Sequence, residues 1–89
     1  MTTVRFEPRE GVLSVRGHAG AGAKGRDLVC AALSILAETA AALPGAETSR
    51  GDGSCTVRAA PEALAVLARG FRLLARDYPQ FVRFEEGEG

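Results

Sequence analysis

The chain has 89 residues, and its 11 basic and 11 acidic residues give a formal net charge of zero. This length predicts one domain, residues 1–89, with a modest core. The balanced charge argues against a general affinity for phosphate backbones, so we expect no direct binding of nucleic acid. No apolar run approaches the ~20 residues of a membrane helix, and the first residues lack the basic and apolar regions of a signal peptide. We therefore expect neither a membrane segment nor secretion.

The first predicted element is a β-hairpin. Apolar and polar residues alternate over 4–7 and again over 13–16, which is typical of strands with one buried face. Arg9-Glu10-Gly11 separates the two stretches and predicts the turn between them.

A glycine-rich segment, 17–26, follows the hairpin and contains Gly17, Gly20, Gly22 and Gly25. Each glycine disfavours a helix by about 1 kcal/mol relative to alanine, so we interpret this segment as a mobile loop over a functional site.

A long helix is predicted after this loop. Asp27 is a favourable N-cap residue, and apolar residues from Val29 to Leu43 recur at the spacing of one buried helix face. Pro44-Gly45 ends the helix.

A second hairpin is predicted over 48–60, around the turn Gly51-Asp52-Gly53. Its first arm, 48–50, is weakly apolar and suits the edge of a sheet. Cys55 lies on the inward face of the second arm, where we expect it to pack in the core.

The last elements are a helix and a strand. The helix begins near Pro61, a residue favoured in the first turn, and ends at Tyr78-Pro79. Gly70 lies in the middle of this helix, where a glycine allows close packing. The stretch 81–84 predicts a strand, and 85–89 a frayed tail.

These elements predict an α+β fold in the order strand, strand, helix, strand, strand, helix, strand. Two helices are too few to cover both faces of a mainly antiparallel sheet of about five strands, so both should lie on one face. We place the first strand at an edge of the sheet. We expect the uncovered face to bind a second copy of the chain, because a domain of this size gains from burying more surface.

The segment from Gly17 to Ser34 contains the only histidine of the chain, His18, and one of its two cysteines, Cys30. His18 follows the second strand. Cys30 lies in the first turn of the predicted helix, where unpaired N–H groups and the helix dipole favour a thiolate. We therefore interpret Cys30 as a nucleophile and His18 as its base, which later protonates the leaving amine. Backbone N–H groups of the loop or the helix start would hold the oxyanion.

Simpler interpretations of the same residues stay open. Cysteine is often a small buried apolar residue, and a single histidine after a strand is often an exposed turn residue. Asp27 either orients His18 or only caps the helix. Ser34, one turn after Cys30, either joins the site or bonds back to its own helix.

The chain does not suggest a metal or cofactor site. One histidine and two cysteines without paired spacing do not make a zinc site. The glycines match neither the P-loop nor the dinucleotide-binding fingerprint. We expect no metal, no cofactor, and two free thiols in a reducing cytoplasm.

A resemblance to a known family rests on two pieces of this segment, Gly17-His18-Ala19-Gly20 and Gly25-Arg26-Asp27-Leu28-Val29-Cys30-Ala31-Ala32-Leu33-Ser34. They resemble the ribosomal-processing cysteine protease family, Prp. Its pattern is Gly-His-Ala, then Gly-x-Asp-(Ile/Leu)-Val-Cys-Ala-Ala-(Val/Leu)-Ser. His18 and Cys30 match the catalytic pair of that family, and Asp27 and Ser34 match the accompanying polar positions. The family often has a bulkier residue where this chain has 21–23, which implies a looser grip on substrate.

The resemblance implies a small homodimeric endopeptidase of the bacterial cytoplasm. Its substrate would be a short N-terminal extension of a large-subunit ribosomal protein, number twenty-seven of that set, removed during ribosome maturation. The main alternative is a non-catalytic, ribosome-associated module that only binds a peptide. A third is a thiol-based redox or acyl-transfer enzyme, which lacks a second cysteine near Cys30 in the sequence.

Overall fold

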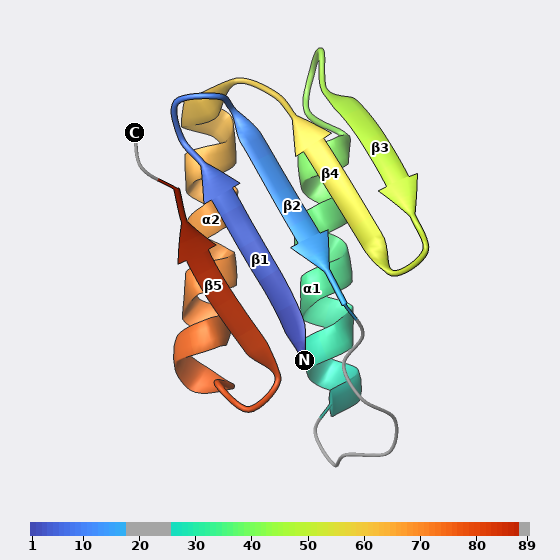
Figure 1. Cartoon of the computed structure of the whole chain (residues 1–89), viewed down its shortest axis with the longest axis vertical. Coiled ribbons are helices and arrows are strands. Elements are labelled where there is room, and N and C mark those ends of the chain that lie inside the picture. The colour runs from blue at the N-terminus through green and yellow to red at the C-terminus, as the bar shows by residue number, and fades with distance from the viewer. Residues whose placement is uncertain (18–25, 88–89) are drawn as a thin grey trace.

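The computed structural model describes residues 1–17 and 26–87, and the backbone alone at Arg26 and Asp27. The described residues form seven elements in the predicted order (Figure 1). They are β1 (Thr2–Glu7), β2 (Val12–Arg16), α1 (Arg26–Ala41), β3 (Glu47–Gly51), β4 (Ser54–Arg58), α2 (Pro61–Asp77) and β5 (Val82–Glu86).

The five strands form one sheet in the order β3-β4-β2-β1-β5. All neighbouring strands are antiparallel except β1 and β5, which run parallel. The expectation that the first strand lies at an edge is therefore wrong. β1 pairs on both sides and buries Val4 and Phe6, whereas β3 forms an edge, as predicted.

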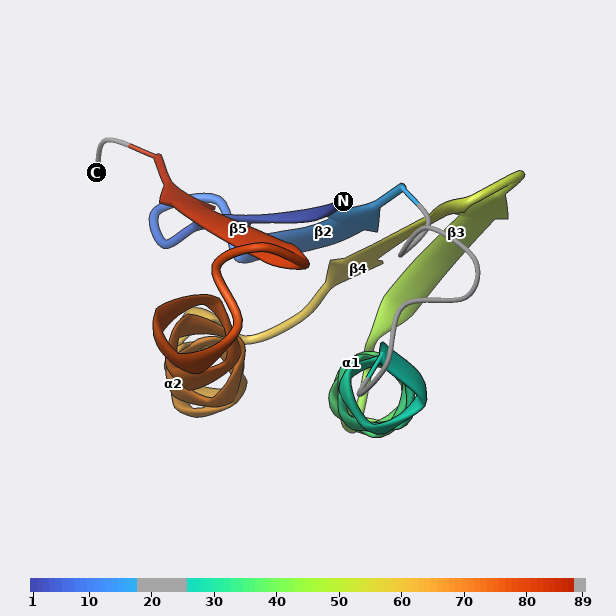
Figure 2. The same cartoon turned by 90° about the horizontal axis from the view of Figure 1, so that it is seen from below.

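Both helices lie on the same face of the sheet, as predicted for this α+β fold (Figure 2). α1 lies below the β3–β4 half and α2 below the β1–β5 half. The core between the layers contains buried residues from both helices and four strands. They are Val4, Phe6, Leu13, Val29, Leu33, Ala40, Val57, Leu64, Ala68, Phe71 and Val82.

The two helices approach each other at Gly70. A Cβ built at this position would lie 2.9 Å from a methyl carbon of Leu36 on α1. The absence of a side chain at Gly70 therefore allows the close contact between α2 and α1 that its position suggested. Neither of the two described helices has the length and hydropathy needed to span a membrane.

The last strand is longer than predicted. β5 continues through Glu85 and Glu86, which were expected in a frayed tail. Parallel pairing with β1 extends to Phe6 opposite Glu86, and the Gly87 N–H donates to the Phe6 carbonyl at 2.8 Å. The Glu86 carboxylate also pairs with Arg72 of α2. The two glutamates suggested a solvated tail because they are charged. Edge strands often contain charged residues, so they are equally compatible with β5.

The uncovered face of the sheet is polar. One row of cross-strand neighbours runs across all five strands on this face, and its residues are Ser49, Thr56, Ser14, Arg5 and Glu85. The large apolar side chains that are most exposed among the described residues lie elsewhere. They are Leu28 and Ile35 on α1, Val66 and Leu73 on α2, and Met1. The expected dimer surface on the open sheet face therefore has no apolar centre.

Candidate active site

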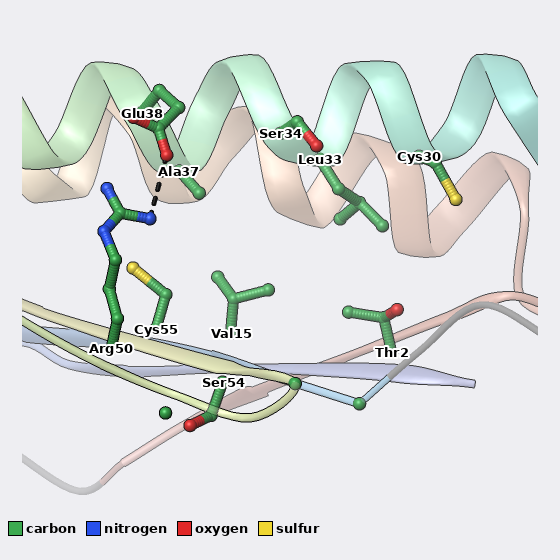
Figure 3. Close-up of a pocket in the computed structure, with 13 residues that line it drawn as sticks. Thr2, Val15, Cys30, Leu33, Ser34, Ala37, Glu38, Arg50, Ser54 and Cys55 are labelled. Atoms are coloured by element: carbon green, nitrogen blue, oxygen red, sulfur yellow. Dashed lines mark ion pairs between the residues drawn. The ribbon is translucent and has the colours of Figure 1, made fainter.

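A groove of about 420 Å³ lies between α1 and the inner face of the sheet (Figure 3). Cys30, Ser34 and Glu38 follow one another at four-residue spacing along the helix wall, and Leu33 and Ala37 complete that wall. Positions four apart share a helix face, so this spacing directs all three polar side chains to the groove. The opposite wall comes from β1, the end of β2, β3, β4 and the β3–β4 turn.

Cys30 lies at one end of the groove, with its thiol directed toward the sheet (Figure 3). It is half-buried and is a free thiol. α1 begins at Arg26, one residue before the predicted N-cap, so Cys30 lies in the second helical turn rather than the first. Arginine favours helix and an acidic residue is favourable in the first turn, which accounts for the earlier start. Helical side chains lean toward the N-terminus, so the thiol still points to that end of α1.

The predicted partner of Cys30 lies outside the described residues. His18, Gly20, Gly22 and Gly25 all fall in 18–25, and the side chain of Asp27 also lies outside the described part of the chain. The pairing of His18 with Cys30 and the role of Asp27 therefore stay predictions. Ser34 lines the same groove as Cys30, as their spacing suggested.

Gly17 ends the described part of the hairpin and lines the groove. Its φ of 99° lies in the region that favours glycine. Its N–H donates to the Gly53 carbonyl at 2.8 Å, and a Cβ at this position would lie 2.6 Å from the Met1 carbonyl oxygen. Gly17 therefore holds the end of β2 against both the start of β1 and the β3–β4 turn.

The far end of the groove contains an ion pair. Arg50 Nη1 of β3 lies 2.9 Å from Glu38 Oε1 of α1. The hydrogen bond and charge of Glu38, with a smaller effect from Cys55, raise the pKa of Arg50 above its ordinary value. The contact ties the edge strand to the helix over the groove.

Cys55 packs against the core, as expected, but it also lines the groove. It lies opposite Arg50 in the sheet register, at the other end of the groove from Cys30 (Figure 3). Both cysteines are free. The fold therefore places both thiols along one groove, but at separate ends.

Sequence reasoning missed Thr2, which lines the groove next to Cys30 (Figure 3). Thr2 is 3 % exposed, and among the described residues it is the only polar one that is buried. Thr2 precedes the strand predicted from Val4, and extending the alternation of Val4 and Phe6 back by two residues places it on the inward face. Arg50 and Glu38 were also missed, because their proximity depends on where α1 lies over the sheet.

The family model for cysteine protease Prp matches residues 1–83. The chain belongs to this family. The fold agrees with solved Prp structures. The essential ribosomal processing protease Prp from S. aureus, with a covalently linked product peptide, superposes with a TM-score of 0.80 at 20 % identity, covering 98 % of this chain and 100 % of that one.

A second structure of the S. aureus protein, with a substrate peptide, has a TM-score of 0.80 at 19 % identity, with the same coverage of both chains. SMU.848 from Streptococcus mutans has a TM-score of 0.69 at 22 % identity, covering 96 % of this chain and 90 % of that chain. At these identities the structures establish the shared fold. A search of curated proteins finds no match.

Proposed function

We propose that residues 1–89 form a single cysteine endopeptidase domain that acts in the cytoplasm. Its proposed reaction is removal of a short N-terminal extension from large-subunit ribosomal protein number twenty-seven during ribosome maturation. The observation that carries the proposal is the Cys30 thiol at one end of a groove, in a chain of the cysteine protease Prp family. The S. aureus relative, a ribosomal processing protease, was solved with substrate and product peptides.

The length of the groove supports a polypeptide substrate. Cys30 and Glu38 both line it, and the helical rise of 1.5 Å per residue separates them by about 12 Å along α1. An extended chain advances about 3.3 Å per residue, so roughly three to four substrate residues fit between these side chains. The end with Glu38 and Arg50 would then contact the substrate away from the cleaved bond.

The proposed chemistry is acyl transfer to sulfur. The Cys30 thiolate attacks the scissile carbonyl carbon, and His18 accepts the thiol proton and gives it to the leaving amine. The C–N bond breaks as the thioester forms, and water then hydrolyses the thioester to restore the thiol. Backbone N–H groups stabilise the oxyanion. Asp27 and Ser34 support this arrangement, and Gly17, Gly20, Gly22 and Gly25 belong to the segment that admits the substrate.

A homodimer is part of the same proposal. Leu28 and Ile35 lie seven residues apart on α1 and are 73 % and 64 % exposed, so they share one outward helix face. Val66 and Leu73 repeat this spacing on α2. These side chains, rather than the polar sheet face, offer apolar surface for a second copy.

The test is cleavage of the host ribosomal protein with its extension, followed by mass spectrometry of the fragments. The wild-type protein and the Cys55→Ala variant should cleave at one bond within or next to the extension. Cys30→Ala and His18→Ala should cleave at least about 100-fold more slowly, because nucleophile and base act as one unit. Circular dichroism should show that all variants keep the fold.

Two results would contradict the proposal. Full activity of Cys30→Ala would exclude Cys30 as the nucleophile. Tight binding of the precursor without cleavage by the wild-type protein would instead support a peptide-binding module.

A further inference from the structure

Thr2 contains a buried hydroxyl without a hydrogen-bond partner among the described residues. The residue is 3 % exposed, and its backbone N–H donates to the Phe81 carbonyl at 2.9 Å. Within residues 1–17 and 26–87, none of the hydrogen bonds uses its hydroxyl. Buried polar groups are nearly always hydrogen-bonded, so one without a partner among the described residues calls for an explanation.

The hydroxyl lies in the candidate active site. Thr2 and Cys30 line the same groove, Thr2 from the sheet and Cys30 from α1. In Figure 3 the Thr2 side chain points from the sheet toward the helix, with its hydroxyl on the side of Cys30. A peptide carbonyl that enters this end of the groove would meet both groups.

The position of Thr2 is fixed by contacts with two neighbouring segments, β5 and the end of β2. It lies in register with Val82 of β5, at the start of the interior strand β1. A Cβ at Gly17 would lie 3.6 Å from the Thr2 Cα, so the end of β2 packs closely on its other side. A hydroxyl held in this way would lose little conformational freedom when it binds a ligand.

The fold itself does not need this hydroxyl. Valine has the same branched shape, favours strands, and would fill the site without burying an unpaired polar group. The hydroxyl therefore adds no contact within the described residues, whereas a substrate carbonyl in the groove would pair with it.

We propose that the Thr2 hydroxyl is a binding group for the polypeptide substrate, donating a hydrogen bond to a main-chain carbonyl next to the bond that Cys30 attacks. This inference rests on the proposed function and deepens it. A main-chain carbonyl is the acceptor that every peptide offers, and the hydroxyl rotates to meet it. Thr2 would therefore help to position the substrate main chain, and it would not select between substrate side chains.

The test compares Thr2→Val, which removes only the hydroxyl function, with Thr2→Ser, which keeps it. Thr3→Val is the matched control, because Thr3 is the neighbouring threonine on the opposite face of β1. No tag should precede Met1, which lies against Gly17. The measurements are the melting temperature and kcat/KM on a peptide that spans the extension and its cleavage site.

Thr2→Val should lower kcat/KM by about tenfold, the effect of one hydrogen bond, with a melting temperature equal to or above that of the wild type. Thr2→Ser and Thr3→Val should stay within about threefold of wild-type activity. Wild-type activity in Thr2→Val would overturn the inference. A lower melting temperature that accounts for its lost activity would also overturn it, because the hydroxyl would then be structural.

A separate outcome concerns the proposed function. If the wild-type protein does not cleave the peptide, the protease proposal fails. The Thr2 inference is then tested by the affinity of the Cys30→Ala protein for the same peptide, with and without Thr2→Val. If Thr2→Val weakens binding of the peptide to the Cys30→Ala protein, the result supports the Thr2 inference. Equal affinity of the two proteins, or no binding by either, overturns the inference.

Discussion

Gly17 lines the groove, and its backbone conformation and close contacts require a glycine. Its φ of 99° costs a non-glycine residue about 1–2 kcal/mol, and a Cβ would also meet the Met1 carbonyl oxygen at 2.6 Å. We expect Gly17→Ala to destabilise the fold by more than the conformational cost alone. The measurement is urea unfolding followed by circular dichroism, since the chain has no tryptophan.

Gly45→Ala is the matched control for that variant. Gly45 has a φ of 75°, but a Cβ at this position would meet nothing within 4 Å, so the variant isolates the conformational cost. The excess loss in Gly17→Ala then measures the clash with Met1. Equal losses in the two variants would show that the end of β2 is not held against β1 in solution.

The candidate site was only partly accessible to sequence reasoning at the residue scale. Cys30 and Ser34 could be assigned to one groove because helical spacing places them on one face. Thr2 lies before the predicted strand, and extending the alternation back to it indicates only that its side chain points inward, not that its hydroxyl lacks a partner among the described residues. Arg50 carried none, because its pairing with Glu38 depends on which half of the sheet α1 covers.

At the scale of elements, the apolar stripe of α2 is the main contact between helix and core. Leu64 is fully buried and Leu73 is 50 % exposed on the same helix. Leu64→Ala should cost about 2–5 kcal/mol of unfolding free energy, a large part of the ~5–15 kcal/mol typical of a domain.

Leu73→Ala, which removes the same atoms from an exposed site, should change the unfolding free energy by about 0.5 kcal/mol or less. Chemical denaturation of both variants checks this difference. Similar costs for the two leucines would mean that α2 packs in another orientation.

The order and type of the elements followed from the sequence because local signals define them. Period-two alternation marked the hairpins, and Pro61 and the apolar spacing marked the second helix. The position of β1 could not be found in this way, since its parallel pairing with β5 joins residues from opposite ends of the chain. The same pairing extends β5 over Glu85 and Glu86, whose charges alone suggested a tail.

At the scale of the whole molecule, the proposed dimer depends on the apolar helix faces. We expect Ile35→Lys, at a residue 64 % exposed, to shift the protein toward monomer in light scattering at several concentrations. Lysine would bring a charge into the apolar centre of the interface, where charged residues are depleted. Thr56→Lys places the same side chain on the open sheet face and should leave the oligomeric state unchanged.

Two outcomes would contradict this assignment. A wild-type protein that stays monomeric at all concentrations would remove the dimer from the proposal. If Thr56→Lys dissociates the dimer and Ile35→Lys does not, the interface lies on the open face of the sheet instead.

The parallel pairing of β1 with β5 has a consequence for biosynthesis. Translation makes Val4 and Phe6 well before residues 82–86, so one side of their strand receives its partner only when those later residues have been added. Until then a nascent chain exposes an apolar strand with unpaired amide and carbonyl groups, which is prone to pair with other chains. The sheet is therefore completed only after β5 has been made, and chaperones that shield exposed strands would protect the growing polypeptide during that interval.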